Sequence, residues 1–168
     1  MTINKKAMGV GQVFVFIIAA LSFALIMIFG YKAIGDFLPQ GEKVQFYQFK
    51  TDVETSIQRI YSEYGSVRIE QFNTPGDYHQ ICFVDLNAPF NPEMCPFDQY
   101  GCGVWKDAGS YDRADANVFL KPLPEAEIPP IKVYNIQMEQ GFLCLPITQG
   151  QFTVILEGRG DHAFISLP

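Results

Sequence analysis

The sequence predicts an α+β protein with an N-terminal transmembrane helix, followed by an amphipathic helix packed on an antiparallel β-sheet of about six or seven short, disulfide-bonded strands. Three observations predict it: an unbroken apolar run at 13–29, a helical apolar stripe at 46–64, and repeated short strand-like runs after Gly65. A chain of 168 residues that is 48% hydrophobic is long enough for one ordinary domain and too apolar to be disordered.

The apolar run defines the first two segments. Between Val13 and Phe29 no residue is charged and Ser22 is the only hydroxyl. Continued as a helix to Ile34, the run covers the ~30 Å hydrocarbon core of a bilayer. We therefore assign 1–12 to a basic leader or cytoplasmic tail and 13–34 to a transmembrane helix. A cleaved secretory signal ending near Gly35 and a buried helix of a soluble core are the alternatives, but the run is long for the first and lacks a polar face for the second.

Charge predicts the orientation and the partners. Lys5 and Lys6 precede the apolar run, so the N-terminus is expected in the cytoplasm and the rest of the chain outside it, on a single-pass protein of the cell membrane. Residues 36–168 carry all eighteen acidic residues and nine of the twelve basic ones, a formal charge of −9. The expected partners are the lipid bilayer and, through the transmembrane helix, other copies or other membrane or surface proteins. The acidic charge argues against nucleic acid.

A short linker and an amphipathic helix are expected next. Pro39 and Gly41 predict a break, so 35–43 is assigned to a linker and 44–168 to an extracytoplasmic α+β domain. Thr51 with Glu54 resembles a capping box, and Gly65 is a stop signal. The apolar stripe of this helix consists of Phe46, Phe49, Val53, Ile57, Ile60 and Tyr64.

The remainder has the composition of short strands separated by turns. Residues 139–141 and 148–150 resemble hairpin turns, and Gly158 with Gly160 resembles a third. Residues 87–116 are expected to form a long loop, and the proline-dense stretch 121–130 an extended connector. The strand candidates are 66–72, 78–86, 116–120, 131–137, 141–147, 151–158 and 162–167.

The four cysteines predict two disulfides, because an even number in an oxidising compartment normally pairs. Of the three connectivities we favour Cys82 with Cys144, which neighbouring strands can bring together, and Cys95 with Cys102, which closes a small loop. A four-cysteine zinc site is the alternative, but it normally needs closer pairs than these.

The basic start "KKAMGVG", the uninterrupted apolar helix and the helix-plus-sheet domain together resemble the type IV pilin-like surface proteins, including the archaeal ones. The resemblance implies that a peptidase removes the leader after Gly11, before Gln12, or else after Gly9. It also implies that the exposed helix then packs with its copies into a filament core. The fifth place after the first cut is Phe16, where many members carry glutamate.

No catalytic constellation is found, and we predict no enzyme and no cofactor. His79 and His162 are the only histidines, and Asp161 beside His162 is not expected to form a dyad because neighbours on a strand point to opposite faces. Arg159-Gly160-Asp161 resembles an integrin-binding tripeptide, although a turn is the simpler interpretation. The acidic residues near 98–117 could offer oxygen ligands to calcium, but their spacing fits no known calcium loop and a solvated loop is favoured.

The sequence thus favours a membrane-anchored extracytoplasmic structural or interaction protein, specifically a pilin-like subunit of a surface assembly. The alternative is an anchored binding module that recognises a ligand or partner through the 87–116 loop. The recognition residues expected in that loop are Trp105, Asp107, Tyr111, Asp112 and Asp115.

Overall fold

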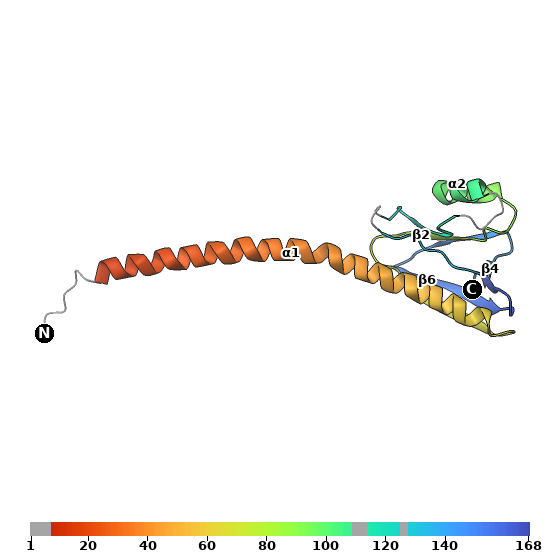
Figure 1. The fold of residues 1–168 in the computed structure, drawn as a ribbon, viewed down its shortest axis with the longest axis horizontal. Helices are drawn as coiled ribbons and strands as arrows, with labels where there is room; N and C mark the ends of the chain where they lie inside the picture. The colour runs from red at the N-terminus through yellow and green to blue at the C-terminus, as the bar shows by residue number, and fades with distance from the viewer. Residues whose placement is uncertain (1–7, 109–113, 125–127) are drawn as a thin grey trace. The chain divides into compact units, whose positions relative to one another are not determined.

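The longest element is the helix α1 (Met8–Tyr61), which accounts for 54 residues (Figure 1). The computed structural model describes residues 8–108, 114–124 and 128–168, and the side chains of α1 at 11–33 and 43–61. The predicted leader therefore lies largely outside the described residues. The chain divides into an N-terminal unit, Met1–Gly41, and a C-terminal unit, Glu42–Pro168.

The predicted break at 35–43 is wrong, because the backbone of α1 stays helical through it. A proline inside a helix costs about 3 kcal/mol. Starting a second helix instead costs roughly 4 kcal/mol, because nucleation has an equilibrium constant near 10⁻³. The two costs are similar, so helical residues on both sides of Pro39 can carry the helix past it. The boundary between the two units nevertheless falls inside the expected linker.

In the C-terminal unit, α1 is amphipathic as predicted. Its stripe of Phe46, Phe49, Val53, Ile57 and Ile60 is 3% exposed or less.

Two details at this part of the helix differ from the prediction. The helix ends at Tyr61, so Tyr64 lies beyond it and is 83% exposed. Thr51 is not a cap, because it lies within the helix and its hydroxyl donates to the carbonyl of Tyr47 at 2.8 Å. Local cap chemistry was overridden here because the residues before Thr51 also bury apolar side chains.

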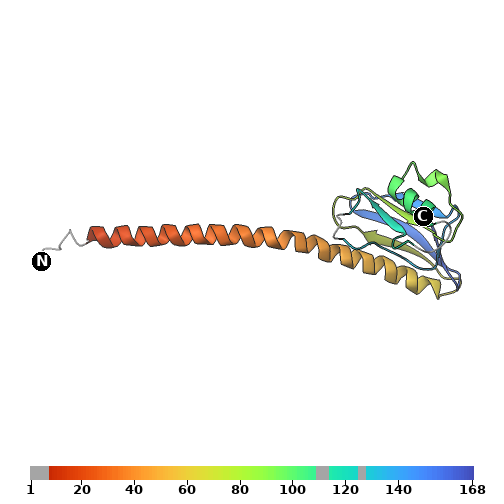
Figure 2. The ribbon, with the colours of Figure 1, turned by 45° about the horizontal axis from the view of Figure 1, so that its top comes forward.

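The seven predicted strands are all present, and the α+β class is confirmed (Figures 1 and 2). They form two sheets instead of one, a four-stranded sheet in the order β1-β6-β7-β4 and a three-stranded sheet in the order β3-β2-β5. All neighbours are antiparallel except β4 and β7, which are parallel. The strands are β1 (Val67–Asn73), β2 (Gln80–Val84), β3 (Val118–Lys121), β4 (Ile136–Gln137), β5 (Phe142–Pro146), β6 (Gln151–Gly158) and β7 (Ala163–Ser166).

The division into two sheets changes two of the three predicted hairpins. Residues 139–141 and 148–150 do form turns, with positive φ at Gly141, Gln149 and Gly150. They lead from β4 to β5 and from β5 to β6, however, and each of these steps passes from one sheet to the other. The third turn does join neighbours, because β6 and β7 pair with Gly158 opposite Ala163.

The main core lies between α1 and the two sheets. Alternate residues of β6 point inward, and Phe152 contacts Phe49 of α1 and Phe83 of β2 with ring centroids 6.2 and 6.1 Å apart. Val154 and Leu156 follow on the same face and are 1% exposed or less. The same apolar cluster therefore holds the helix and both sheets together.

A second, smaller core covers the other face of the β2 sheet. It is built by the short 3₁₀ helix η1 (Pro92–Met94) and by α2 (Gln99–Ala108), so the predicted 87–116 loop contains regular structure. Trp105 of α2 packs with Val84 and Phe142 in this cluster. In Figure 1, α2 lies on one side of the β2 sheet and the last turns of α1 lie on the other.

Gly158 is required where β6 meets the end of α1. A Cβ atom at this position would clash with the carbonyl oxygens of Ile60 and Glu63. Backbone atoms cannot move aside as a flexible side chain can. The position therefore accepts no side chain without displacing the helix end.

We expect Gly158→Ala to destabilise the C-terminal unit by about 3 kcal/mol, because it overpacks a contact made by backbone atoms. Thermal unfolding followed by circular dichroism measures the effect. The matched control is Gly103→Ala in α2, where a Cβ meets no atom within 4 Å. That change should be neutral or stabilising by up to about 1 kcal/mol, as for glycine replaced in a helix. Equal melting temperatures for the two variants would contradict the proposed contact.

Candidate functional site

The candidate membrane span is the part of α1 at Gly11–Ala33, close to the predicted 13–34. It has 23 residues and a mean hydropathy of 2.8, and none of it is buried within the chain. At about 1.5 Å per residue it is long enough to cross a bilayer. Gly11 and Gln12, the expected cleavage position, are the first residues of this apolar segment and are exposed.

Leaving the apolar segment exposed to water would cost more free energy than a folded domain typically has. Between Val13 and Phe29, thirteen large apolar side chains are exposed, and Phe16 is 67% exposed. Burying one such side chain gains roughly 1.5 to 3 kcal/mol, so the thirteen together gain on the order of 20 to 40 kcal/mol. A whole domain is typically stable by only about 5 to 15 kcal/mol. The segment therefore needs an apolar environment from outside the chain, either lipid or other proteins.

Both predicted disulfides are confirmed. Cys82 and Cys144 occupy directly opposite positions on β2 and β5, with Cα atoms 4.0 Å apart. Cys95 after η1 is joined to Cys102 in α2, closing a short loop. By loop-closure entropy the first bridge, with a sequence separation of 62, contributes about 4 kcal/mol and the second, with a separation of 7, about 2 kcal/mol. The bridges brace the central sheet and the helix that covers it.

The predicted recognition loop is only partly available for binding. Trp105 was expected to anchor a recognition surface, and this is wrong because its side chain is fully buried. It serves as the centre of the second core, since it lies on the inner face of α2. Asp107 and Asp115 are exposed, whereas Tyr111 and Asp112 lie outside the described residues.

Two of the residues with oxygen atoms between 98 and 117, Asn117 and Asp98, have structural partners. Asn117 is 3% exposed, and its side chain both donates to the carbonyl of Val133 and accepts from its N–H, at 2.8 and 2.7 Å. Asp98 accepts a hydrogen bond from the N–H of Tyr100 at the start of α2. Within 8–108, 114–124 and 128–168, no group of three or more metal-ligating side chains is found.

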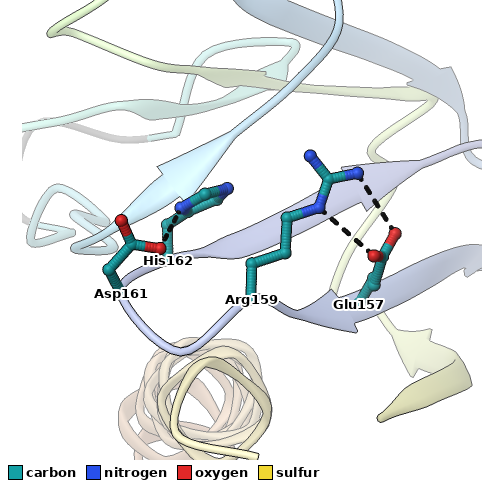
Figure 3. Close-up of polar contacts among 4 residues, drawn as sticks. All are labelled: Glu157, Arg159, Asp161 and His162. Carbon is teal, nitrogen blue, oxygen red and sulfur yellow. Dashed lines mark hydrogen bonds and ion pairs between the residues drawn. The ribbon is translucent and has the colours of Figure 1, made fainter. Parts of the chain in front are cut away.

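Figure 3 shows four polar residues at the end of β6 and in the turn that leads to β7: Glu157, Arg159, Asp161 and His162. The guanidinium of Arg159 donates to both carboxylate oxygens of Glu157 and lies 4.1 Å above the ring of Phe164. Gly160 has a φ of +91°, a backbone conformation that favours glycine and lets the chain turn toward β7. Its N–H donates to the carbonyl of Tyr61 at the end of α1. Arg159 thus has partners within the chain, while its side chain stays 41% exposed.

Asp161 and His162 do form a pair, contrary to the expectation. Their Oδ1 and Nδ1 atoms are 2.6 Å apart (Figure 3). The strand argument fails because both residues precede β7 and lie in the turn, where the alternation of a strand does not apply. The Nε2 atom of His162 is buried without a partner, and Nδ1 is held by Asp161.

An apolar groove of about 570 Å³ was not anticipated from the sequence. It runs beside α2 and β3 and is bordered by the proline-rich connector, so its walls come from segments far apart in the chain. Spacing along the sequence contains no signal for such a groove. Residues that line it include Phe46, Val104, Leu120, Leu123 and Ile131.

Trp105→Ala should act on stability. We expect it to destabilise the C-terminal unit by about 3 to 5 kcal/mol, because it empties the centre of the second core. The control is Asp107→Ala, two residues further along α2 and exposed, which should stay within about 0.5 kcal/mol. Urea unfolding of both variants measures the difference. An unchanged midpoint for Trp105→Ala would mean that its side chain is not packed as described.

Comparisons with protein-family models, curated proteins and solved structures find no match to this chain. Its function is therefore inferred from its own physical features. These are the exposed apolar segment, the two disulfides and the acidic C-terminal unit.

Proposed function

We propose that this chain is a membrane-anchored, extracytoplasmic structural protein that acts as a pilin-like subunit of a surface assembly. The exposed apolar segment Gly11–Ala33 is the observation that carries the proposal. It would lie in the bilayer before assembly and would pack against the same segment of other copies afterwards. Either environment removes its side chains from water.

The use of one helix for two purposes supports this proposal. In the C-terminal unit, α1 buries a stripe in the chain's own core, whereas residues 11–33 are buried against nothing in the chain. A subunit that assembles through its helix needs this division, because the C-terminal unit must fold without using the apolar segment. The resemblance of the leader to pilin-like proteins is consistent with the same role.

The orientation is part of the proposal. Lys5 and Lys6 precede the apolar segment, and positive charge near a span favours the cytoplasmic side. The C-terminal unit would then lie outside the cytoplasm, in agreement with its two disulfides, which persist in oxidising compartments. Its acidic charge would keep neighbouring copies soluble until the apolar segments bring them together.

The anchored binding module is the second candidate, and the groove beside α2 is the observation that favours it. With Trp105 buried, the exposed residues available to a partner there include Tyr100 and Asp115. This candidate has no need of leader removal. The mature N-terminus therefore separates it from the pilin-like subunit.

The first test is the mass and N-terminal sequence of the protein purified from its native membranes. A subunit of the proposed kind should begin at Gln12, or at Val10 if the cut follows Gly9. An intact N-terminus would favour the anchored binding module, and a start near Asp36 would indicate a released domain and would contradict both.

The second test is Leu21→Glu, at an apolar position of the segment that is 61% exposed in the chain. A charge within the apolar segment costs about 2.5 to 3.5 kcal/mol in an apolar environment, so assembly should fall at least about tenfold. The control is Tyr134→Glu, which places the same charge on an exposed position of the C-terminal unit and should leave assembly unchanged. Quantifying the sedimentable, surface-sheared fraction measures the effect. Equal yields for Leu21→Glu and the parent chain would refute packing through this segment.

A further inference from the structure

The strand β1 forms an open edge of the four-stranded sheet. Two hydrogen bonds flank its pairing with β6. One runs from the N–H of Gly158 to the carbonyl of Ser66, and the other from the N–H of Thr74 to the carbonyl of Gly150. In an antiparallel pair such bonds recur at every second residue, so even-numbered residues of β1 face β6. The residues whose N–H and C=O groups point away from the sheet are the odd-numbered ones, Val67, Ile69, Gln71 and Asn73.

The side chains of this edge are unusually apolar on one face. Val67 is 62% exposed and Ile69 is 70% exposed, and the residues opposite them on β6 are Glu157 and Ile155. Open edges are normally shortened, covered or interrupted, because their free backbone groups bind other strands. This edge is seven residues long and contains neither proline nor a bulge in its pairing with β6, and its charged residues are Arg68 and Glu70, one of each sign.

The opposite face of the edge is charged. Arg68 and Glu70 point toward α1, and a polar groove of about 280 Å³ separates β1 from the helix there. Asp52, Arg59 and Glu70 contribute the charges of this groove. No ion pair joins Glu70 to another residue within the part of the chain that the structure describes. The groove therefore has a carboxylate available to a cation from outside.

We propose that β1 is an interface between two copies of this chain, which pair their β1 strands antiparallel with Ile69 opposite Ile69. In this register Arg68 of each copy lies opposite Glu70 of the other. Cross-strand pairs of opposite charge stabilise antiparallel strands. The outward backbone groups of Val67, Ile69 and Gln71 gain partners at the same time.

Charge selects this register from its neighbours. A shift by two residues in one direction places Glu70 opposite Glu70, and in the other direction it places Arg68 opposite Arg68. Both arrangements oppose like charges, which is destabilising. A shift by one residue would place residues that already bond to β6 opposite residues with free backbone groups, so the hydrogen bonds between the two β1 strands could not form. The sequence Arg-Ile-Glu is thus self-complementary about Ile69.

The existing contact of Arg68 is compatible with this pairing. Its Nη2 atom donates to Glu63 at 2.6 Å, and both side chains remain more than one third exposed. A guanidinium has five N–H donors in a planar fork, so it can hold Glu63 and a second carboxylate together. The arginine is thereby oriented along the edge before a second copy arrives.

The interface is closed, because a two-fold axis through Ile69 uses the same surface on both copies. It joins the two four-stranded sheets into one and leaves no open β1 edge. It involves only the C-terminal unit, so it goes beyond the proposed function and does not depend on packing of the apolar segment. Within each C-terminal unit α1 runs antiparallel to β1, because Phe49 packs near the end of β1 and Ile60 near its start. The two-fold axis therefore sets these parts of α1 in opposite directions, so this contact is distinct from the packing of apolar segments in the proposed assembly.

Cross-linking of the full-length protein in detergent tests the pairing. All four native cysteines are in disulfides, so Ile69→Cys introduces the only free thiol. Two such thiols would meet at the two-fold axis, and mild oxidation should give a covalent dimer in high yield. The control Lys106→Cys, on an exposed position of α2, should cross-link at least about tenfold less. Equal yields for the two variants would overturn the proposal.

Charge reversal in the Ile69→Cys background tests the register. Arg68→Glu and Glu70→Arg should each lower the dimer yield roughly tenfold, because each turns two attractive pairs into repulsive ones. The double variant R68E/E70R restores both pairs and should recover the yield to within about threefold. Glu70→Arg leaves the Arg68 contact with Glu63 intact, so its effect cannot come from losing that contact. Failure of the double variant to recover would overturn the register and with it the proposal.

The same preparations separate this proposal from the proposed function. Leu21→Glu weakens packing through the apolar segment and should leave the Ile69→Cys dimer in place. If Leu21→Glu abolishes both the association and the cross-link, the copies meet through α1 alone, which would overturn the β1 interface and support the pilin-like assembly.

Discussion

The packing of Phe152 between α1 and the β2 sheet is the contact on which the C-terminal unit depends. Its ring meets Phe49 of the helix and Phe83 of the other sheet, so three elements share one apolar centre. Neither sheet could remain exposed on this face, because each presents a row of large apolar side chains there. The helix contributes the third wall, and the fold is therefore closed only when α1 is in place.

This constraint explains how one helix can be divided between two environments. The stripe from Phe46 to Ile60 is used within the chain, and its spacing of three and four residues keeps the opposite face polar. The segment Gly11–Ala33 has no polar face and is not buried by any of the described residues. The contrast is chemical, since the same backbone conformation serves both parts, and it supports a role in which the first part is buried by lipid or by other copies.

The C-terminal unit has an open sheet edge at β1, whose outer backbone groups have no partner strand among the described residues. An edge strand lacks hydrogen-bond partners, whereas the apolar segment lacks an apolar environment, and the two deficits call for different partners. Two polar side chains at other places in this unit are satisfied within the chain. Asn117 bonds the backbone of Val133, and Arg159 is held by Glu157 and Phe164, although both had first been considered as parts of binding motifs.

The sequence by itself determined the features that depend on local periodicity and composition: the apolar segment, the stripe on α1, the seven strands and the cysteine pairs. Only the tertiary structure decided how those elements combine. The turns at 139–141 and 148–150 have the residues of hairpins, yet they lead into another sheet, because strand partners are chosen by burial of both faces. The tertiary structure also decided the place of two candidate site groups. Trp105 is buried because α2 turns its indole toward the β2 sheet, and Asp161 meets His162 because both lie in the turn before β7. Residue spacing specifies which face of an element is apolar, but the surface that covers that face comes from distant parts of the chain.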